Sequence, residues 1–217
     1  MSSIITVATL KGGSGKSTVA SCLAVHWHLA GRGPVIIDAD PQRSIGRLAA
    51  RAQALGRVPV TEDASEAVWK TARRLAAGRG PVVIDTPGFR SPATLACLAA
   101  ADFVLVPVKP SPLDVDRMLD TLGILVGGLN GWKPIFRCLL TQVTRESVIA
   151  RQIRDEIADA GFPLLDSEMP NRVVYAEAAL YGATPSMMDR AGPAARDIAA
   201  IAGEIDSILS IKRAARA

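Results

Sequence analysis

A glycine-rich segment with two lysines lies near the start of the chain, between a short apolar run and a helical pattern. It reads Leu-Lys-Gly-Gly-Ser-Gly-Lys-Ser-Thr over residues 10–18. Its three glycines allow the backbone to curl, so that successive N–H groups point at phosphate oxygens where a helix begins. Lys16 brings a positive charge to β- and γ-phosphates, and the Ser17 hydroxyl is suited to coordinate Mg²⁺. The pattern predicts a loop that binds ATP with Mg²⁺ through Lys11, Gly12, Gly13, Ser14, Gly15, Lys16, Ser17 and Thr18.

Carboxylates end two further apolar runs. Asp38 and Asp40 stand two residues apart, so both side chains point the same way if the strand continues that far. Asp85 ends the run that begins at Pro81. The carboxyl ends of parallel strands face the crevice in which ligands bind, so all three acids are candidates for this site. We expect Asp85 to hold Mg²⁺ through a water molecule, because Mg²⁺ keeps much of its hydration shell. For one of the first two acids, capping of the next helix is an open alternative.

These residues are positioned by short strands that alternate with longer helical segments. Near-continuous apolar runs, typical of strands buried on both faces, occur at 4–9, 35–38, 81–85, 103–107 and 136–141. Helical spacing occurs at 16–30, 65–77, 92–101, 113–125 and 148–160. Alternation of this kind predicts right-handed βαβ units. The expected fold class is α/β: a doubly wound, mostly parallel sheet with helices on both faces, formed by residues 1–217 as one P-loop ATPase domain.

Composition excludes several other classes of protein. Apolar residues make up 49% of the 217 residues and charged residues 21%, which is typical of a folded domain and not of a disordered chain. The three cysteines, Cys22, Cys97 and Cys138, lie far apart without metal-ligand spacing, which argues against a disulfide framework and a zinc site. No apolar run approaches the roughly 20 residues of a membrane-spanning helix. We expect a cytoplasmic protein, and its net charge of +4 suits an anionic partner.

The phosphate loop departs from the general pattern in a specific way. Leu10 stands where a glycine is usual, and Lys11 follows it. The form Lys-Gly-Gly-x-Gly-Lys-Ser resembles the deviant Walker A loop of the ParA/MinD ATPases. The resemblance implies an ATP-dependent homodimer in which Lys11 reaches across the interface to the partner's nucleotide. Lys11, Lys16 and Asp40 are then the catalytic residues, with Asp40 acting on the attacking water. Ser17, Asp38 and Asp85 are the implied metal residues.

Two later segments extend the resemblance over most of the chain. Residues 107–114 resemble the proline-rich stretch of the small ParF-type partition ATPases. Residues 139–142 stand where the family carries a strand end close to the base, and residues 169–178 resemble a segment that packs near adenine. Met169 and Asn171 differ from the family pattern there. The adenine contacts that the resemblance implies are Thr141, Pro170 and Asn171.

The resemblance implies a positioning or partition ATPase. In this hypothesis the ATP-bound dimer binds nucleoid DNA without sequence preference, and a ParB-like or other adaptor protein stimulates hydrolysis. The cargo could be a plasmid, a chromosome region or a protein assembly, and the sequence does not indicate which. The basic residues that are candidates for DNA contact are Arg145, Arg151, Arg154, Arg172, Arg190, Arg196, Lys212, Arg213 and Arg216.

The sequence leaves two alternatives to this hypothesis. The first is a MinD-like ATPase that associates with membranes through an amphipathic tail. That tail would combine the apolar Ile201, Ile205, Ile208 and Leu209 with a basic end of Lys212, Arg213 and Arg216, but it lacks bulky aromatic residues and its apolar residues suit packing on the sheet. The second is a metabolic enzyme of the same fold, such as an iron–sulfur electron donor, which requires cysteines on loops beside the nucleotide. Cys97 and Cys138 fall within a predicted helix and a predicted strand instead. Membrane binding is therefore not expected.

Overall fold

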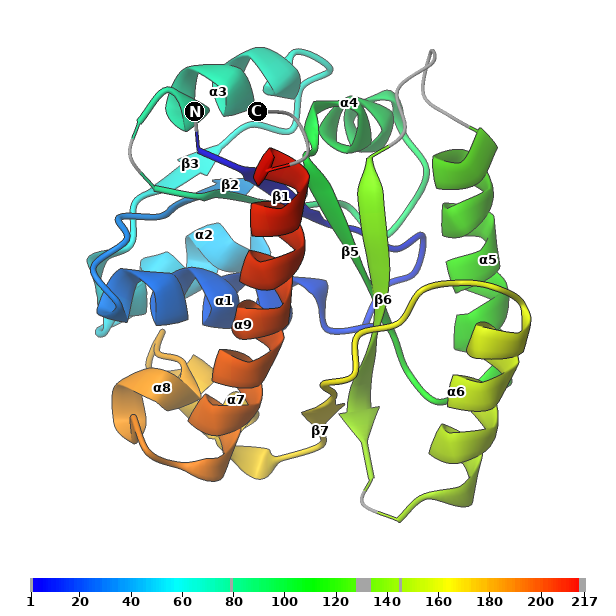
Figure 1. Ribbon diagram of the computed structural model, residues 1–217. Helices are drawn as coiled ribbons and strands as arrows, with labels where there is room; N and C mark the ends of the chain where they lie inside the picture. The colour runs from blue at the N-terminus through cyan, green and yellow to red at the C-terminus, as the bar shows by residue number, and fades with distance from the viewer. Residues whose placement is uncertain (1, 79, 128–133, 145, 215–217) are drawn as a thin grey trace.

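A computed structural model describes residues 2–78, 80–127, 134–144 and 146–214, with only the backbone of Lys212 and Arg213. Its centre is a parallel sheet with the strand order β3-β2-β4-β1-β5-β6-β7 (Figure 1). Every pair of neighbouring strands in it is parallel. The strands are β1 Ile4–Val7, β2 Val35–Asp38, β3 Val60–Glu62, β4 Val82–Asp85, β5 Phe103–Val108, β6 Ile135–Val143 and β7 Met169–Pro170.

Helices cover both faces of the sheet, because successive residues of each buried strand point to opposite sides. On one face, Ile5 and Ile36 pack in a core with α1 and α9. On the other face, Ile4 and Ile37 pack with α3 and α4, while β5 and β6 pack with α5 and α6. The helices are α1 Lys16–Leu29, α2 Ser44–Ala49, the 3₁₀ turn η1 Ala54–Arg57, α3 Val68–Ala76, α4 Pro92–Ala100, α5 Pro112–Gly127, α6 Val148–Asp159, α7 Val173–Leu180, α8 Pro185–Met188 and α9 Pro193–Ala214.

The predicted doubly wound parallel sheet is confirmed, and all five predicted strands and five predicted helices are present. The sequence reasoning did not place α2, η1, β3, β7, α7 or α8. Each of these is short: β3 has three residues, β7 two, and α8 four. Too few side chains are then available to reveal a periodic pattern.

The C-terminal helix α9 is part of the core and not an exposed amphipathic tail. Ile201 and Ile205 are fully buried, and Leu209 is nearly so, in the same core as Leu23 of α1. Figure 1 shows α9 crossing the sheet beside α1. Since its apolar face is already covered, the membrane alternative loses the surface on which it depended. Among the described residues, no helix combines the length and the apolar character that a bilayer crossing requires.

Candidate nucleotide-binding site

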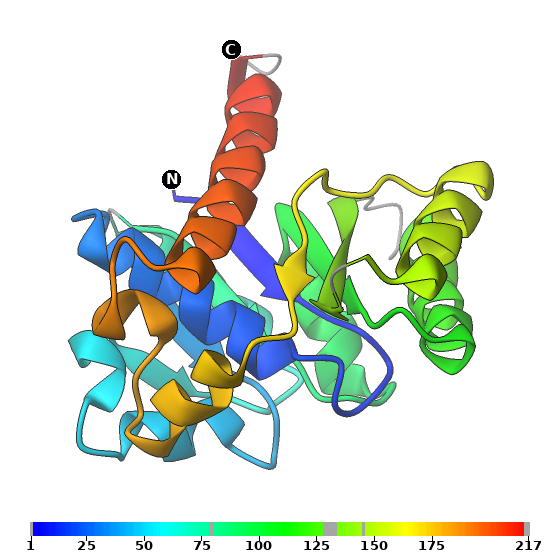
Figure 2. The ribbon, with the colours of Figure 1, turned by 90° about the horizontal axis from the view of Figure 1, so that it is seen from below.

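The phosphate loop connects β1 to α1 at the carboxyl edge of the sheet. Figure 2 shows the molecule of Figure 1 from below, with this loop between β1 and α1. Gly13 and Gly15 have φ values of 78° and 92°, a region that residues with a Cβ rarely occupy. The loop is held from β6 by two side chains. The hydroxyl of Thr141 donates to the carbonyl of Ser14 at 2.9 Å, and Nε2 of Gln142 donates to the carbonyl of Gly13 at 3.2 Å. The curled backbone predicted for phosphate binding is therefore fixed by the strand beside it.

Lys16 is a buried ammonium at the base of this loop, with only 6% of its surface exposed. Its Nζ donates to the carbonyl of Lys11 at 2.7 Å. Burial lowers the pKa of Lys16, and the carboxylates of Asp85 and Asp40 oppose that shift. Among the described residues, that carbonyl is the hydrogen-bond partner of Nζ. A partly desolvated cation of this kind gains strongly from a phosphate, because charge-assisted hydrogen bonds are about twice as strong as neutral ones.

Asp85 and Ser17 form the part of the site that fits Mg²⁺. The Ser17 hydroxyl donates to Oδ2 of Asp85 at 2.6 Å, and Asp85 is fully buried. Burial raises the pKa of Asp85 to about 7, while the hydrogen bond from Ser17 lowers it. Oδ1 of Asp85 has no hydrogen-bond partner among the described residues. A buried carboxylate oxygen left without a partner beside a hydroxyl matches the hard oxygen ligands that Mg²⁺ prefers.

Asp38 and Asp40 have different surroundings despite their spacing. Asp38 is buried, and its two oxygens accept from the backbone N–H groups of Asp40 at 3.2 Å and of Gly46 at 2.8 Å. Burial raises the pKa of Asp38, and these hydrogen bonds lower it. Gly46 lies in the first turn of α2, so this geometry supports the capping alternative for Asp38. Asp40 is less buried, accepts from the N–H of Gln42 at 2.9 Å, and is close enough to influence Lys16.

Lys11 is paired within its own chain. Its Nζ lies 2.6 Å from Oδ2 of Asp114, at the start of α5. Asp114 is nearly buried, and its Oδ1 has no hydrogen-bond partner among the described residues. Sequence reasoning did not single out Asp114, although the residue ends the proline-rich stretch that carried part of the resemblance. Lys11 is therefore not a freely solvated side chain, because it is ion-paired with Asp114.

A cavity of about 260 Å³ adjoins the helix end of the phosphate loop. Thr141, Pro170 and Asn171, the three residues named for adenine, all line it, together with Gly15 and Thr18. They come together because β7 pairs with the end of β6, and the N–H of Asn171 donates to the carbonyl of Val143 at 2.8 Å. The Thr141 hydroxyl is buried and directed at the loop backbone, so its role is to position that backbone. Gln142, Arg172 and Tyr175 also line the cavity. They fall within the segments 139–142 and 169–178 that carried the resemblance, but they were not named as adenine contacts.

The described candidates for DNA contact are spread over several elements, and two of them are ion-paired. Arg154 is paired with Glu168 at 2.6 Å, and Arg172 with Asp197 at 2.7 Å. The other three described candidates are exposed and lie on separate elements: Arg151 on α6, Arg190 after α8 and Arg196 on α9. Arg145 and Arg216 lie outside the described residues, as do the side chains of Lys212 and Arg213.

The three cysteines are all buried. Burial raises the pKa of each thiol to about 12, so none is available as a thiolate on a loop beside the nucleotide site. The cysteines therefore give the iron–sulfur alternative no ligands.

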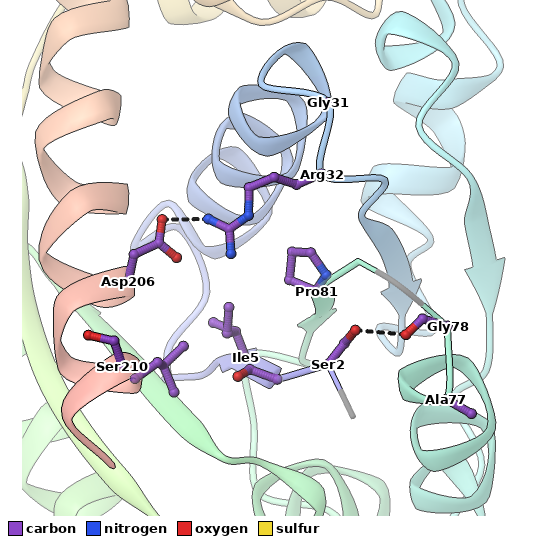
Figure 3. Close-up of a pocket in the computed structure, with 11 residues that line it drawn as sticks. Ser2, Ile5, Gly31, Arg32, Ala77, Gly78, Pro81, Asp206 and Ser210 are labelled. Atoms are coloured by element: carbon purple, nitrogen blue, oxygen red, sulfur yellow. Dashed lines mark hydrogen bonds and ion pairs between the residues drawn. The ribbon is translucent and has the colours of Figure 1, made fainter. Parts of the chain in front are cut away.

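A larger groove of about 840 Å³ lies at the opposite edge of the sheet (Figure 3). It opens between α9 and the ends of α1 and α3. Asp206 lines it and accepts from Nη1 of Arg32 at 2.5 Å and from Nε1 of Trp27 at 3.2 Å. No predicted site residue lines this groove, although it is larger than the cavity beside the phosphate loop. The volume of a cavity therefore does not identify the nucleotide site in this protein.

Comparisons with known proteins agree with this geometry. The family described as the CobQ/CobB/MinD/ParA nucleotide binding domain matches residues 5–185. The chain is 28% identical over 213 residues to the maintenance of carboxysome distribution protein A of Halothiobacillus neapolitanus, covering 95% of this chain and 94% of that protein. It is also 28% identical over 234 residues to the chromosome-partitioning ATPase Soj of Thermus thermophilus, covering 93% and 94%.

The fold resembles that of the septum site-determining protein MinD of Pyrococcus horikoshii, solved in complex with Mg-ADP. The TM-score is 0.75 at 19% identity, and the match covers 98% of this chain and 99% of that one. The family match spans most of the chain and includes the loop and the carboxylates described above. The chain therefore belongs to the CobQ/CobB/MinD/ParA family of nucleotide-binding domains and is a ParA/MinD-type ATPase, a type whose cofactors are ATP and Mg²⁺.

Proposed function

We propose that this chain is a positioning ATPase that closes into a homodimer on ATP, binds duplex DNA without sequence preference, and is released when an adaptor protein stimulates hydrolysis. The observation that carries the proposal is the second lysine of the phosphate loop, Lys11, placed on the same loop as the catalytic Lys16. The relatives that match nearly the whole chain are a carboxysome distribution protein and a chromosome-partitioning ATPase, which supports positioning as the role.

The proposed hydrolysis assigns one task to each side chain of the site. Lys16 neutralises the β- and γ-phosphates, and Ser17 with Asp85 holds Mg²⁺. Mg²⁺ supplies additional positive charge to the phosphates as negative charge develops on them. Asp40 accepts a hydrogen bond from the attacking water and orients it. Asp38 fixes the backbone that carries Asp40, through its hydrogen bonds to the N–H groups of Asp40 and Gly46.

Dimer formation requires a change at Lys11. Its ion pair with Asp114 keeps it within its own chain, so it must leave that carboxylate before it can reach a partner's nucleotide. Lys11 is 33% exposed and Asp114 only 6%, so the lysine is the mobile member of the pair. The phosphates of a partner's nucleotide would replace Asp114 as its counterion, which links nucleotide occupancy to dimerisation.

The experiment that tests this proposal is a mobility shift on two unrelated duplexes with ADP, with ATP and with a non-hydrolysable analogue, at several salt concentrations. We expect similar binding to both duplexes with ATP or the analogue, weak binding with ADP, and log affinity that falls linearly with log salt. Strong preference for one duplex would identify an operator-binding regulator instead. Absence of DNA binding together with ATP-dependent binding to anionic liposomes would support the membrane alternative.

A further inference from the structure

A third lysine lies against the phosphate loop, outside the motif. Lys109 directly follows β5, and its Nζ is 3.8 Å from the point where a Cβ on Gly13 would lie. The backbone that carries Lys109 is firmly held. Its strand pairs on both sides, with β1 and β6, and its carbonyl accepts from the N–H of Ser111 at 2.7 Å. The ammonium therefore projects from a rigid element onto the loop.

Within the described part of the chain, Lys109 is the lysine on or against the phosphate loop whose charge has no partner. Lys11 is paired with Asp114, and Lys16 donates to the carbonyl of Lys11 while two carboxylates offset its burial. Among the described residues, no hydrogen bond or ion pair is formed by the Lys109 ammonium. A half-buried ammonium without a counterion among the described residues, beside a loop that already carries Lys11 and Lys16, favours the approach of an anion. A polyphosphate is such an anion.

The position along the loop indicates which phosphates Lys109 would meet. The cavity assigned to the nucleoside is lined by Gly15 and Thr18, at the helix end of the loop. Gly13 lies two residues earlier in the loop and does not line that cavity. A phosphate chain that starts at the nucleoside and follows the loop therefore ends near Gly13 and Lys109.

We propose that Lys109 binds the terminal phosphates of ATP from within the same chain and so helps the site to distinguish ATP from ADP. The inference rests on the nucleotide part of the proposed function and is independent of DNA, cargo or adaptor. It divides the work of the three lysines. Lys16 and Lys109 act on the chain's own nucleotide, while Lys11 is left to act on the partner's.

The first experiment measures the affinities of ATP and ADP, with Mg²⁺, for the single variant Lys11→Ala and for the double variant Lys11→Ala/Lys109→Gln. Both lack Lys11, so that dimerisation does not contribute. We expect ATP affinity to fall about tenfold, because the substitution removes a charge-assisted hydrogen bond to the terminal phosphates. ADP affinity should fall by less than about threefold, because ADP lacks the terminal phosphate. Lys109→Arg, which keeps the charge, should retain most of the ATP affinity. Lys70 is an exposed lysine on α3, and the matched control Lys70→Gln should change neither ATP affinity nor ADP affinity.

Unchanged ATP affinity in Lys109→Gln would overturn the proposal. So would equal losses for ATP and ADP with a lower melting temperature, since that pattern indicates a role in holding the loop. If wild type itself failed to bind ATP, the proposed function would fail as well. ATP binding without DNA binding would leave the Lys109 inference intact and contradict the positioning role alone.

A second measurement uses the wild-type protein alone and so does not require any variant to fold. Lysines of the wild-type chain are acetylated with an amine-reactive reagent, with no nucleotide, with Mg-ADP or with Mg-ATP, and the modified sites are quantified by mass spectrometry. We expect Mg-ATP to slow modification of Lys109 severalfold, Mg-ADP to slow it much less, and Lys70 to react equally in all three. Equal reactivity of Lys109 with ATP and ADP would contradict the proposal.

Discussion

At the scale of single residues, the site is made of charges that the fold keeps partly or wholly out of water. Burial lowers the pKa of Lys16 and raises that of Asp85 to about 7, so both groups are pushed towards their neutral forms. In the proposed function, phosphate would favour the charged form of Lys16 and Mg²⁺ would favour that of Asp85. The nucleotide and the metal ion would then offset the electrostatic cost of burying these two groups.

For Lys16, the expectation is loss of tight ATP binding on replacement by alanine. The substitution removes the charge that faces the β- and γ-phosphates, and we expect affinity to fall at least a hundredfold, about 3 kcal/mol. Isothermal titration of ATP with Mg²⁺ measures it, and Lys70→Ala serves as control. An affinity within about threefold of wild type would show that the loop assignment is wrong.

Asp85 gives a prediction about stability and pH. Its folded pKa is raised, so the folded state loses stability as pH rises from the ordinary carboxyl range through about 7, and the full cost is present above that. Without nucleotide and Mg²⁺, Asp85→Asn should therefore be more stable than wild type at pH 8, by about 1–3 kcal/mol. The difference should shrink towards pH 5, where wild-type Asp85 is protonated. Denaturant unfolding at both pH values measures it, and a less stable variant at pH 8 would contradict the account.

Asp40 separates binding from chemistry. Asp40→Ala should bind ATP and accumulate as a dimer while its hydrolysis rate falls at least a hundredfold, because the attacking water loses its orienting base. Phosphate release and size-exclusion chromatography with ATP measure the two properties on one sample. Rapid turnover in this variant would move the catalytic role to another residue, and Asp38 would be the first to test.

At the scale of elements, most of the site is positioned by the strands β1, β4, β5 and β6. The sequence alone was enough to predict these four strands. Long apolar runs of β-branched residues indicate strands buried on both faces, and the loop motif fixes where α1 begins. The segment after Asp40 was not predictable. Its turns place Arg43, Leu55 and Arg57 at positive φ, a conformation that these residue types do not signal. Which of the two acids, Asp38 or Asp40, caps α2 therefore became visible only in the structure.

The contacts made between elements were equally hidden from the sequence. Lys11 meets Asp114 across 103 positions, and Gln142 meets Gly13 across 129. No local pattern encodes such a pairing, because it depends on how α5 and β6 lie beside the loop. In contrast, the pairing of β6 with β7 brings Thr141 and Pro170 to one cavity, and their contact with adenine stays a prediction.

The contact between α5 and the loop leads to a prediction. If Asp114 holds Lys11 back, Asp114→Ala should lower the protein concentration needed for ATP-dependent dimerisation by about threefold or more. Asp116→Ala, an exposed acid on the same helix, should leave it unchanged. Sedimentation velocity with a non-hydrolysable analogue measures the effect. Loss of dimerisation in Asp114→Ala would mean that the carboxylate belongs to the dimer contact itself.

At the scale of the whole molecule, the two edges of the sheet differ in what they offer. The carboxyl edge carries the phosphate loop, the carboxylates and the nucleoside cavity, whereas the opposite edge carries the groove beside Asp206 and Arg32. All the proposed nucleotide chemistry therefore lies at one end. A second chain that contributes Lys11 must approach that end, which leaves the opposite edge and the outer helices free for other partners. The net charge of +4 per chain doubles on dimerisation.

The central claim is that a dimer closed by Lys11 around ATP is the form that binds DNA. The most direct measurement is fluorescence anisotropy of a labelled random duplex, titrated with Asp40→Ala and with the double variant Asp40→Ala/Lys11→Ala, in ATP and in ADP. The account predicts tight binding only for Asp40→Ala in ATP, and at least tenfold weaker binding for the double variant, because two chains held together neutralise more phosphates than one. Equal affinity of both variants in ATP would contradict it.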